Sequence, residues 1–174
     1  MKINNPGAYL DHMMRQSRQH HVQLSSMADV KANMLLTMAS VVVTLSIPHV
    51  LKPQFTIPLL VLIVASLITM GLAAYAVMPK LPLSPSTTPK PDVHSPGFNL
   101  LFFGDFTRLT YDEFAGAMEE MMNDPSKTYE AQVRELYTLG TFLATKKYRM
   151  LRLAYLSFMS GLVASFSVLL ASLV

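Results

Sequence analysis

Three basic side chains cluster where a polar part of the chain gives way to an apolar one. Lys146, Lys147 and Arg149 lie close together, and the apolar stretch 150–174 follows them directly. Cations in such a place are concentrated and partly desolvated, so they could hold the phosphate of a nucleotide. The same side chains could instead contact anionic lipid headgroups and fix the orientation of a membrane span. The sequence leaves both interpretations open.

A second charged pair, Asp29 and Lys31, shortly precedes another apolar stretch, which begins at Met34. These two side chains could form a salt bridge or contact a ligand at the base of a helix. Charged side chains also commonly anchor a helix at the membrane interface, which needs no ligand. We keep both residues as candidates for ligand binding.

An aromatic cluster of Phe102, Phe103 and Phe106 is followed closely by Arg108. The aromatic rings could fill a small helical core, or they could form a platform for the ring of a ligand. The planar guanidinium of Arg108 suits phosphate oxygens. The full set of candidate ligand-binding residues is therefore Asp29, Lys31, Phe103, Arg108, Lys146, Lys147 and Arg149.

No arrangement of residues suggests catalysis or metal binding. The chain contains no cysteine, and the neighbours His20 and His21 point to different helix faces, so they cannot chelate one ion as a pair. We find no phosphate-binding glycine loop, zinc-protease motif or nucleophile elbow. We expect a protein that is not an enzyme and that uses no metal or cofactor. The net charge of +3 is too small to suggest nucleic-acid binding.

Three apolar stretches, residues 34–51, 56–78 and 150–174, determine the architecture that positions these side chains. None contains Asp or Glu, and Arg152 is the only Lys or Arg among them. Each is close to the roughly 20 residues that a helix needs to cross a bilayer core. Within such a core the backbone must satisfy its own hydrogen bonds, so each stretch is helical. The sequence predicts an all-α integral membrane protein with three transmembrane helices.

The distribution of Lys and Arg predicts the orientation of these spans. Basic residues precede the first span, follow the second and precede the third, whereas the short loop between the first two carries only Lys52. Cytoplasmic segments carry the excess of Lys and Arg. We expect the N-terminus in the cytoplasm and the C-terminus outside.

Five segments follow from this layout: a cytoplasmic helix 1–33, a two-span membrane hairpin 34–78, a Pro-rich linker 79–98, a cytoplasmic helical segment 99–149 and the third transmembrane helix 150–174. Apolar spacing before spans one and three predicts stalk helices that continue into these spans. We expect Leu24 and Met27 to face an apolar stripe on the last helix. Thr110 and Glu113 predict a capping box at the start of a short helix.

Four short segments occur in an order that resembles a known family: 28–32 (ADVKA), 77–80 (VMPK), 99–106 (NLLFFGDF) and 146–149 (KKYR). An Asp-x-Lys-Ala box leads into span one, a Pro-basic pair leaves span two, and a basic segment precedes span three. This order is similar to that of the transmembrane effectors of the Pycsar anti-phage systems, over about residues 10–170. The family's usual Arg after the span-two proline is Lys80 here.

The resemblance implies an effector encoded beside a pyrimidine nucleotide cyclase. Such an effector responds to cyclic CMP or cyclic UMP and impairs the bacterial inner (plasma) membrane. Three spans cannot enclose a sizeable pore, and small residues in the spans allow close helix packing, so we expect a homo-oligomer in the lipid bilayer. The alternative is a constitutive membrane anchor or scaffold that recruits a cytoplasmic partner. A neighbouring cyclase gene would favour the effector.

Overall fold

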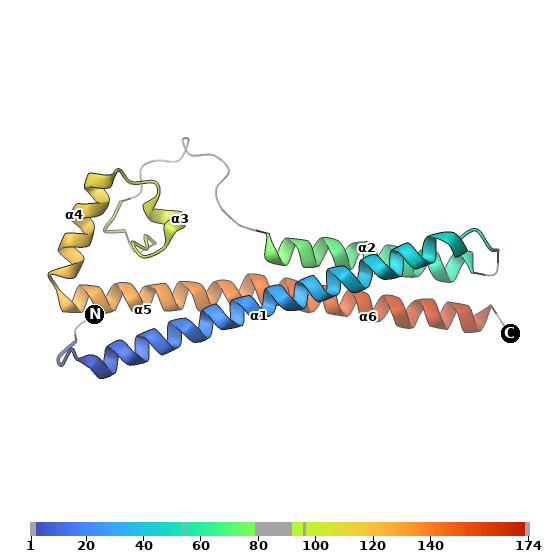
Figure 1. Ribbon diagram of the computed structural model, residues 1–174, viewed down its shortest axis with the longest axis horizontal. Coiled ribbons are helices and arrows are strands. Elements are labelled where there is room, and N and C mark those ends of the chain that lie inside the picture. Colours follow the sequence, from blue (N-terminus) through green and yellow to red (C-terminus); the bar gives the residue numbers. More distant parts are fainter. Residues whose placement is uncertain (1–2, 54, 79–91, 96, 173–174) are drawn as a thin grey trace. The chain divides into compact units, whose positions relative to one another are not determined.

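The computed structural model describes residues 3–53, 55–78, 92–95 and 97–172. Its helices, labelled in Figure 1, are α1 (Ala8–Ser46), the 3₁₀ turn η1 (Ile47–His49), α2 (Thr56–Val77), α3 (Phe103–Phe106), α4 (Tyr111–Met122), α5 (Pro125–Phe142), the π-helical turn η2 (Leu143–Lys147) and α6 (Tyr148–Ala171). The predicted all-α class is confirmed. Most of the predicted Pro-rich linker, residues 79–91 and 96, lies outside the described residues, as do Lys80 and Lys90.

The helices divide between two compact units. One unit comprises residues 1–22 and 79–141, and the other comprises residues 23–78 and 142–174. We call the first the head unit and the second the span unit. The helix α1 contributes residues to both, because it runs from Ala8 to Ser46 without a break. The prediction of a stalk helix continuous with span one is confirmed.

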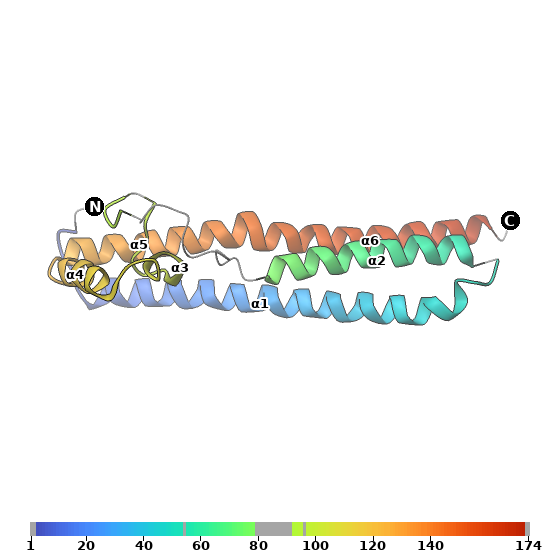
Figure 2. The same cartoon turned by 90° about the horizontal axis from the view of Figure 1, so that it is seen from above.

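The span unit packs α1, α2 and α6 around a core of small and apolar side chains, and these three helices run alongside one another in Figures 1 and 2. The core consists of Ala28, Ala32, Leu35, Ala39, Ala73, Leu151, Ala154 and Phe158. Its alanines allow the helix backbones to approach closely. Three helices are long and apolar enough to cross a membrane, as predicted: Ala8–His49, Thr56–Val77 and Pro125–Ala171.

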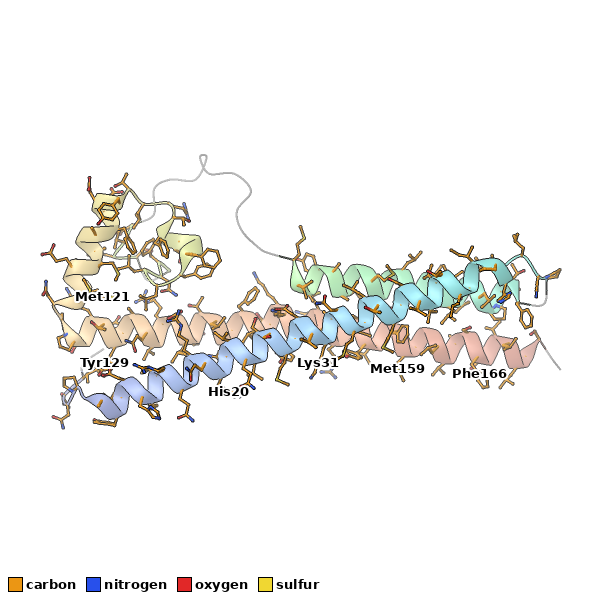
Figure 3. The ribbon with its side chains drawn as sticks, in the orientation of Figure 1. His20, Lys31, Met121, Tyr129, Met159 and Phe166 are labelled. Carbon is orange, nitrogen blue, oxygen red and sulfur yellow. The ribbon has the colours of Figure 1, made fainter. Side chains whose placement is uncertain are left out.

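Large apolar side chains cover the outside of the span unit. Met159 and Phe166 of α6, labelled in Figure 3, are 56% and 62% exposed. Met27 is also 44% exposed, so the prediction that it faces inward is wrong. The buried side of α1 in this unit is formed instead by the alanines and by Leu35. In a bilayer the apolar surface faces lipid while the small residues face neighbouring helices.

The antiparallel helices α2 and α6 approach each other closely in the span unit. A Cβ atom added at Gly161 would overlap the Cβ of Ala65. The hydroxyl of Ser157 donates to the carbonyl oxygen of Ala65 at 3.3 Å, and that of Ser165 donates to the carbonyl oxygen of Pro58 at 2.9 Å. These bonds satisfy hydroxyl groups that would otherwise face an apolar environment.

The head unit packs the first part of α1 against α5 in a parallel arrangement. The phenol of Tyr129 donates to Oδ1 of Asp11 at 2.7 Å, and Arg18 forms an ion pair with Glu135 at 3.1 Å. The predicted capping box is present at the start of α4. The short helix α4 ends at Met122, before Pro125 starts α5, where its fixed φ and missing N–H suit the first helical turn.

Candidate functional site

A buried cation lies at the beginning of α6 in the span unit. Lys147 is 7% exposed, and its ammonium group lies 2.7 Å from Oδ1 of Asp29. The ammonium also donates to the hydroxyl of Ser25 at 2.8 Å. Two of the residues that the sequence singled out, Asp29 and Lys147, are therefore brought together. Of the roles left open for Asp29, the structure contains a salt bridge, and its partner is Lys147.

The π-helical turn explains how Lys147 reaches this position. Hydrogen bonds in a π turn connect residues five apart, so the turn holds one residue more than an α-helical turn. Both ends of the segment, Leu143 and Lys147, are buried. The next residue, Tyr148, donates its phenol hydrogen to the carbonyl oxygen of Leu24 at 2.9 Å. Isolated π turns occur frequently at functional sites.

We call Leu24, Ser25, Asp29, Lys147 and Tyr148 the junction cluster. Its two charges differ in their access to water, because 8% of the Lys147 side chain is exposed and 43% of the Asp29 side chain. The cluster ties α1 to the start of α6 by one ion pair and two hydrogen bonds. A phosphate bound to Lys147 would have to displace the carboxylate of Asp29, so this arrangement is better suited to fixing two helices than to holding an anion.

The other basic candidates of the span unit are on its surface. Lys31, Lys146 and Arg149 are all exposed, and Figure 3 labels Lys31 on α1. Exposed cations at the end of a membrane helix can contact the phosphate groups of anionic lipids.

The remaining two candidates, Phe103 and Arg108, belong to the head unit. Phe103 is 51% exposed, and its ring centroid lies 5.0 Å from that of Phe102. Phe106 is half-buried and packs against Phe114 with ring centroids 5.0 Å apart, so only this part of the aromatic cluster contributes to packing between helices. Arg108 is exposed.

The head unit also contains a cavity of about 290 Å³. Its walls come from residues 93–95 and 98–100, from α4 and from α5. The residues that line it are Val93, His94, Ser95, Phe98, Asn99, Leu100, Ala117, Glu120, Met121, Lys127, Glu130, Ala131 and Arg134. Neither Phe103 nor Arg108 is among them. The sequence analysis missed this cavity, because its lining residues are dispersed along the chain.

Two ion pairs connect charged side chains of the cavity wall. Lys127 lies 2.6 Å from Oε1 of Glu120, and Arg134 lies 3.3 Å from Oε1 of Glu130. Arg134 also donates to the carbonyl oxygen of Ser95 at 3.4 Å. The hydrogen bond from Lys127 lowers the pKa of the Glu120 carboxyl below its ordinary value, so both members of this pair are charged at neutral pH. The cavity can thus offer two cations to an anionic ligand.

Comparisons with known proteins identify the family of the chain. No protein of curated function and no solved structure was found to match the chain. The family model of the Pycsar effector protein domain, PycTM, matches residues 12–174, which include both the junction cluster and the cavity. Members of this family disrupt membranes and are not enzymes. The chain therefore belongs to the Pycsar transmembrane effectors, which act in anti-phage defence at a membrane in response to a cyclic nucleotide.

Proposed function

We propose that the chain senses cyclic CMP or cyclic UMP and then impairs the bacterial inner membrane by rearranging its spans within an oligomer. Family membership supports a cyclic-nucleotide trigger. The observation that carries the mechanism is the unbroken helix α1, which contributes residues 8–22 to the head unit and residues 23–46 to the span unit. Altered packing against its first part would act on a helix that also forms a span.

The junction cluster gives this mechanism a defined point of control. A ligand can shift an equilibrium only by binding the two states with different affinities. In the structure, Asp29 and Lys147 hold α1 to the start of α6 at 2.7 Å. We propose that ligand binding favours a second arrangement of α1 and α6, in which this ion pair is broken or altered.

A groove along the span unit supports self-association. It has a volume of about 540 Å³ and lies between α2 and α6. The lining residues are Leu60, Val61, Val64, Ala65, Ile68, Ser157, Ser160, Gly161 and Ala164. Small residues on one helix and large apolar ones on the other suit the packing of a further helix within a bilayer. We propose that a helix of a second copy of this chain occupies the groove.

A pair of tryptophan variants tests this part of the proposal. Ser160→Trp would fill the groove, so we expect it to reduce the crosslinked oligomer in membranes. The matched control is Val163→Trp, at a position on the same helix that is 63% exposed and does not line the groove. Unchanged crosslinking in Ser160→Trp would contradict the role of the groove.

We further propose that the N-terminus is cytoplasmic and the C-terminus lies outside. The exposed Lys31 and Lys146 support this orientation, because they lie at the ends of spans one and three that face away from Lys52. Reporter fusions at the two termini measure it directly. An active periplasmic reporter at the N-terminus would reverse the assignment.

Dye release from lipid vesicles tests the proposed activity. The purified full-length protein is inserted into vesicles of phosphatidylethanolamine and phosphatidylglycerol, and cyclic CMP or cyclic UMP is titrated. We expect leakage that rises with one of these ligands and is absent with 5′-CMP or 5′-UMP. Folded protein that shows no ligand-dependent leakage would support the alternative of a constitutive anchor or scaffold.

A further inference from the structure

The cavity of the head unit has the composition of a small-molecule site. One part of its wall is apolar and buried, with Phe98 at 6% and Met121 at 9% exposed. Another part carries the charged groups of Lys127 and Arg134. An apolar wall with a few convergent polar groups is typical of pockets that bind and orient small ligands.

The volume of the cavity restricts the ligand to a small one. Its 290 Å³ lies at the lower limit of the roughly 300–1,000 Å³ that ligand pockets occupy. A cyclic mononucleotide has one base, one sugar and one phosphate, whereas a cyclic dinucleotide has two of each. The cavity therefore favours a mononucleotide.

The two cations lie on one face of α5, seven residues or about two helical turns apart. Each is paired with a carboxylate, but these pairs are accessible to water, since the side chains of Lys127 and Arg134 are 51% and 33% exposed. Exposed ion pairs contribute little to stability, so a phosphate can replace the carboxylates. The planar guanidinium of Arg134 can donate two parallel hydrogen bonds to a phosphate.

A buried amide supplies a further polar group. Asn99 is 4% exposed, and its amide oxygen accepts the backbone N–H of Leu101 at 3.1 Å. Asn99 lines the cavity, and its amide nitrogen can donate a hydrogen bond to a carbonyl oxygen of a ligand. Cytosine and uracil both carry such a carbonyl oxygen at position 2.

We infer that this cavity is the binding site of the cyclic pyrimidine mononucleotide. Arg134 and Lys127 bind the cyclic phosphate, Asn99 donates to the carbonyl oxygen of the base, and Phe98 and Met121 form the apolar wall. This inference rests on the proposed function, which names the ligand class. The site differs from the one that the sequence analysis suggested, since Phe103 and Arg108 take no part in it.

Titration calorimetry with the purified full-length protein in nanodiscs tests this inference. The probes are cyclic CMP, cyclic UMP and cyclic di-AMP. We expect Arg134→Gln to weaken binding of the preferred mononucleotide by about 10-fold or more, because it removes a charge-assisted contact. Ala117→Leu should also weaken binding, because it fills the cavity without changing any charge. Lys127→Gln removes the second cation of the cavity. Because this side chain is exposed, the variant should fold normally.

The matched control is Arg15→Gln, which removes an exposed cation of α1 in the head unit that does not line the cavity. It should retain the wild-type affinity. If folded Lys127→Gln and Ala117→Leu both bind the mononucleotide with wild-type affinity, the cavity is not the binding site. The proposed function would still stand in that case. A wild-type protein that binds neither mononucleotide would overturn the proposed function and this ligand assignment with it. Comparable binding of cyclic di-AMP would overturn the restriction to mononucleotides.

Discussion

Removing either charge of the junction cluster should have unequal effects on stability. In Asp29→Asn the ammonium of Lys147 stays 92% buried and keeps Ser25 as its hydrogen-bond partner, but it loses its counter-charge. Breaking a fully buried ion pair in this way costs about 3–5 kcal/mol. Because water reaches the Asp29 side chain, which is 43% exposed, we expect a smaller loss, about 2–3 kcal/mol.

The reciprocal variant, Lys147→Met, should cost much less. Methionine fills a similar volume with an apolar side chain, and the carboxylate left behind at Asp29 can be hydrated. We expect a change within about 1 kcal/mol, and a net stabilisation would also agree with this reasoning. Lys31→Met is the matched control, since it removes an exposed cation and should change stability by less than about 0.5 kcal/mol.

Reversible unfolding in mixed micelles measures the change in the free energy of unfolding for Asp29→Asn, Lys147→Met and Lys31→Met. The protein is titrated with sodium dodecyl sulfate and its helicity is followed by far-ultraviolet circular dichroism. The reasoning is refuted if Lys147→Met loses as much free energy as Asp29→Asn, because the burial of the two charges then does not control their energetics. It is also refuted if Asp29→Asn is as stable as the wild type.

The same unfolding measurement tests the packing of α2 against α6: Gly161→Ala should cost about 1–3 kcal/mol, because its Cβ would overlap Ala65. The control Gly71→Ala adds a Cβ that meets no atom within 4 Å and should stabilise the protein by up to about 1 kcal/mol. In the head unit, Thr110→Ala should cost about 1 kcal/mol by removing the helix cap, and Thr110→Ser should preserve it. Hydrogen exchange of the first turn of α4 measures this effect, and unchanged protection in Thr110→Ala would contradict it.

Much of the fold could be predicted because helix length and helix ends depend on local chemistry. A long apolar stretch without acidic residues can only be a helix in a bilayer, so the spans were predictable. The capping box of Thr110 and Glu113 and the proline at position 125 likewise act within a few residues. Which side chains of a helix point toward the core was harder to predict. Met27 follows the same three- and four-residue apolar spacing as inward-facing residues, so its outward direction could not be told from the sequence.

The local geometry of Gly104 and of the π turn also depends on side-chain contacts. Gly104 lies within α3, where a Cβ would overlap the ring of Phe102. The π turn cannot be read from the residues 143–147 themselves, whose side chains suit an ordinary α-helix. Its buried lysine depends on Ser25 and Asp29, far away in the sequence.

The candidate site was predicted only in part. The sequence singled out Asp29 and Lys147 separately as candidates for ligand binding, and the structure brings these two side chains together in an ion pair. It did not indicate the cavity, since Asn99, Lys127 and Arg134 come from separate segments and form no motif. Basic residues on an amphipathic helix are ordinarily assigned to its solvated face, and only the fold brings two of them to a common cavity.

The residues of the junction cluster come from two distant parts of the sequence, and this distance affects the order of events during biosynthesis. Lys147 follows Ser25 by 122 residues, so at 5–20 residues per second a ribosome needs roughly 6–24 s to produce the second after the first. During this interval the first span can enter the membrane while Asp29 still lacks its lysine. Until Lys147 is made, the nascent α1 can pack only against the part of the chain that precedes this residue, which includes α2. The ion pair can form only after Lys147 has been made, well after both helices of the membrane hairpin, which makes it a late event of assembly.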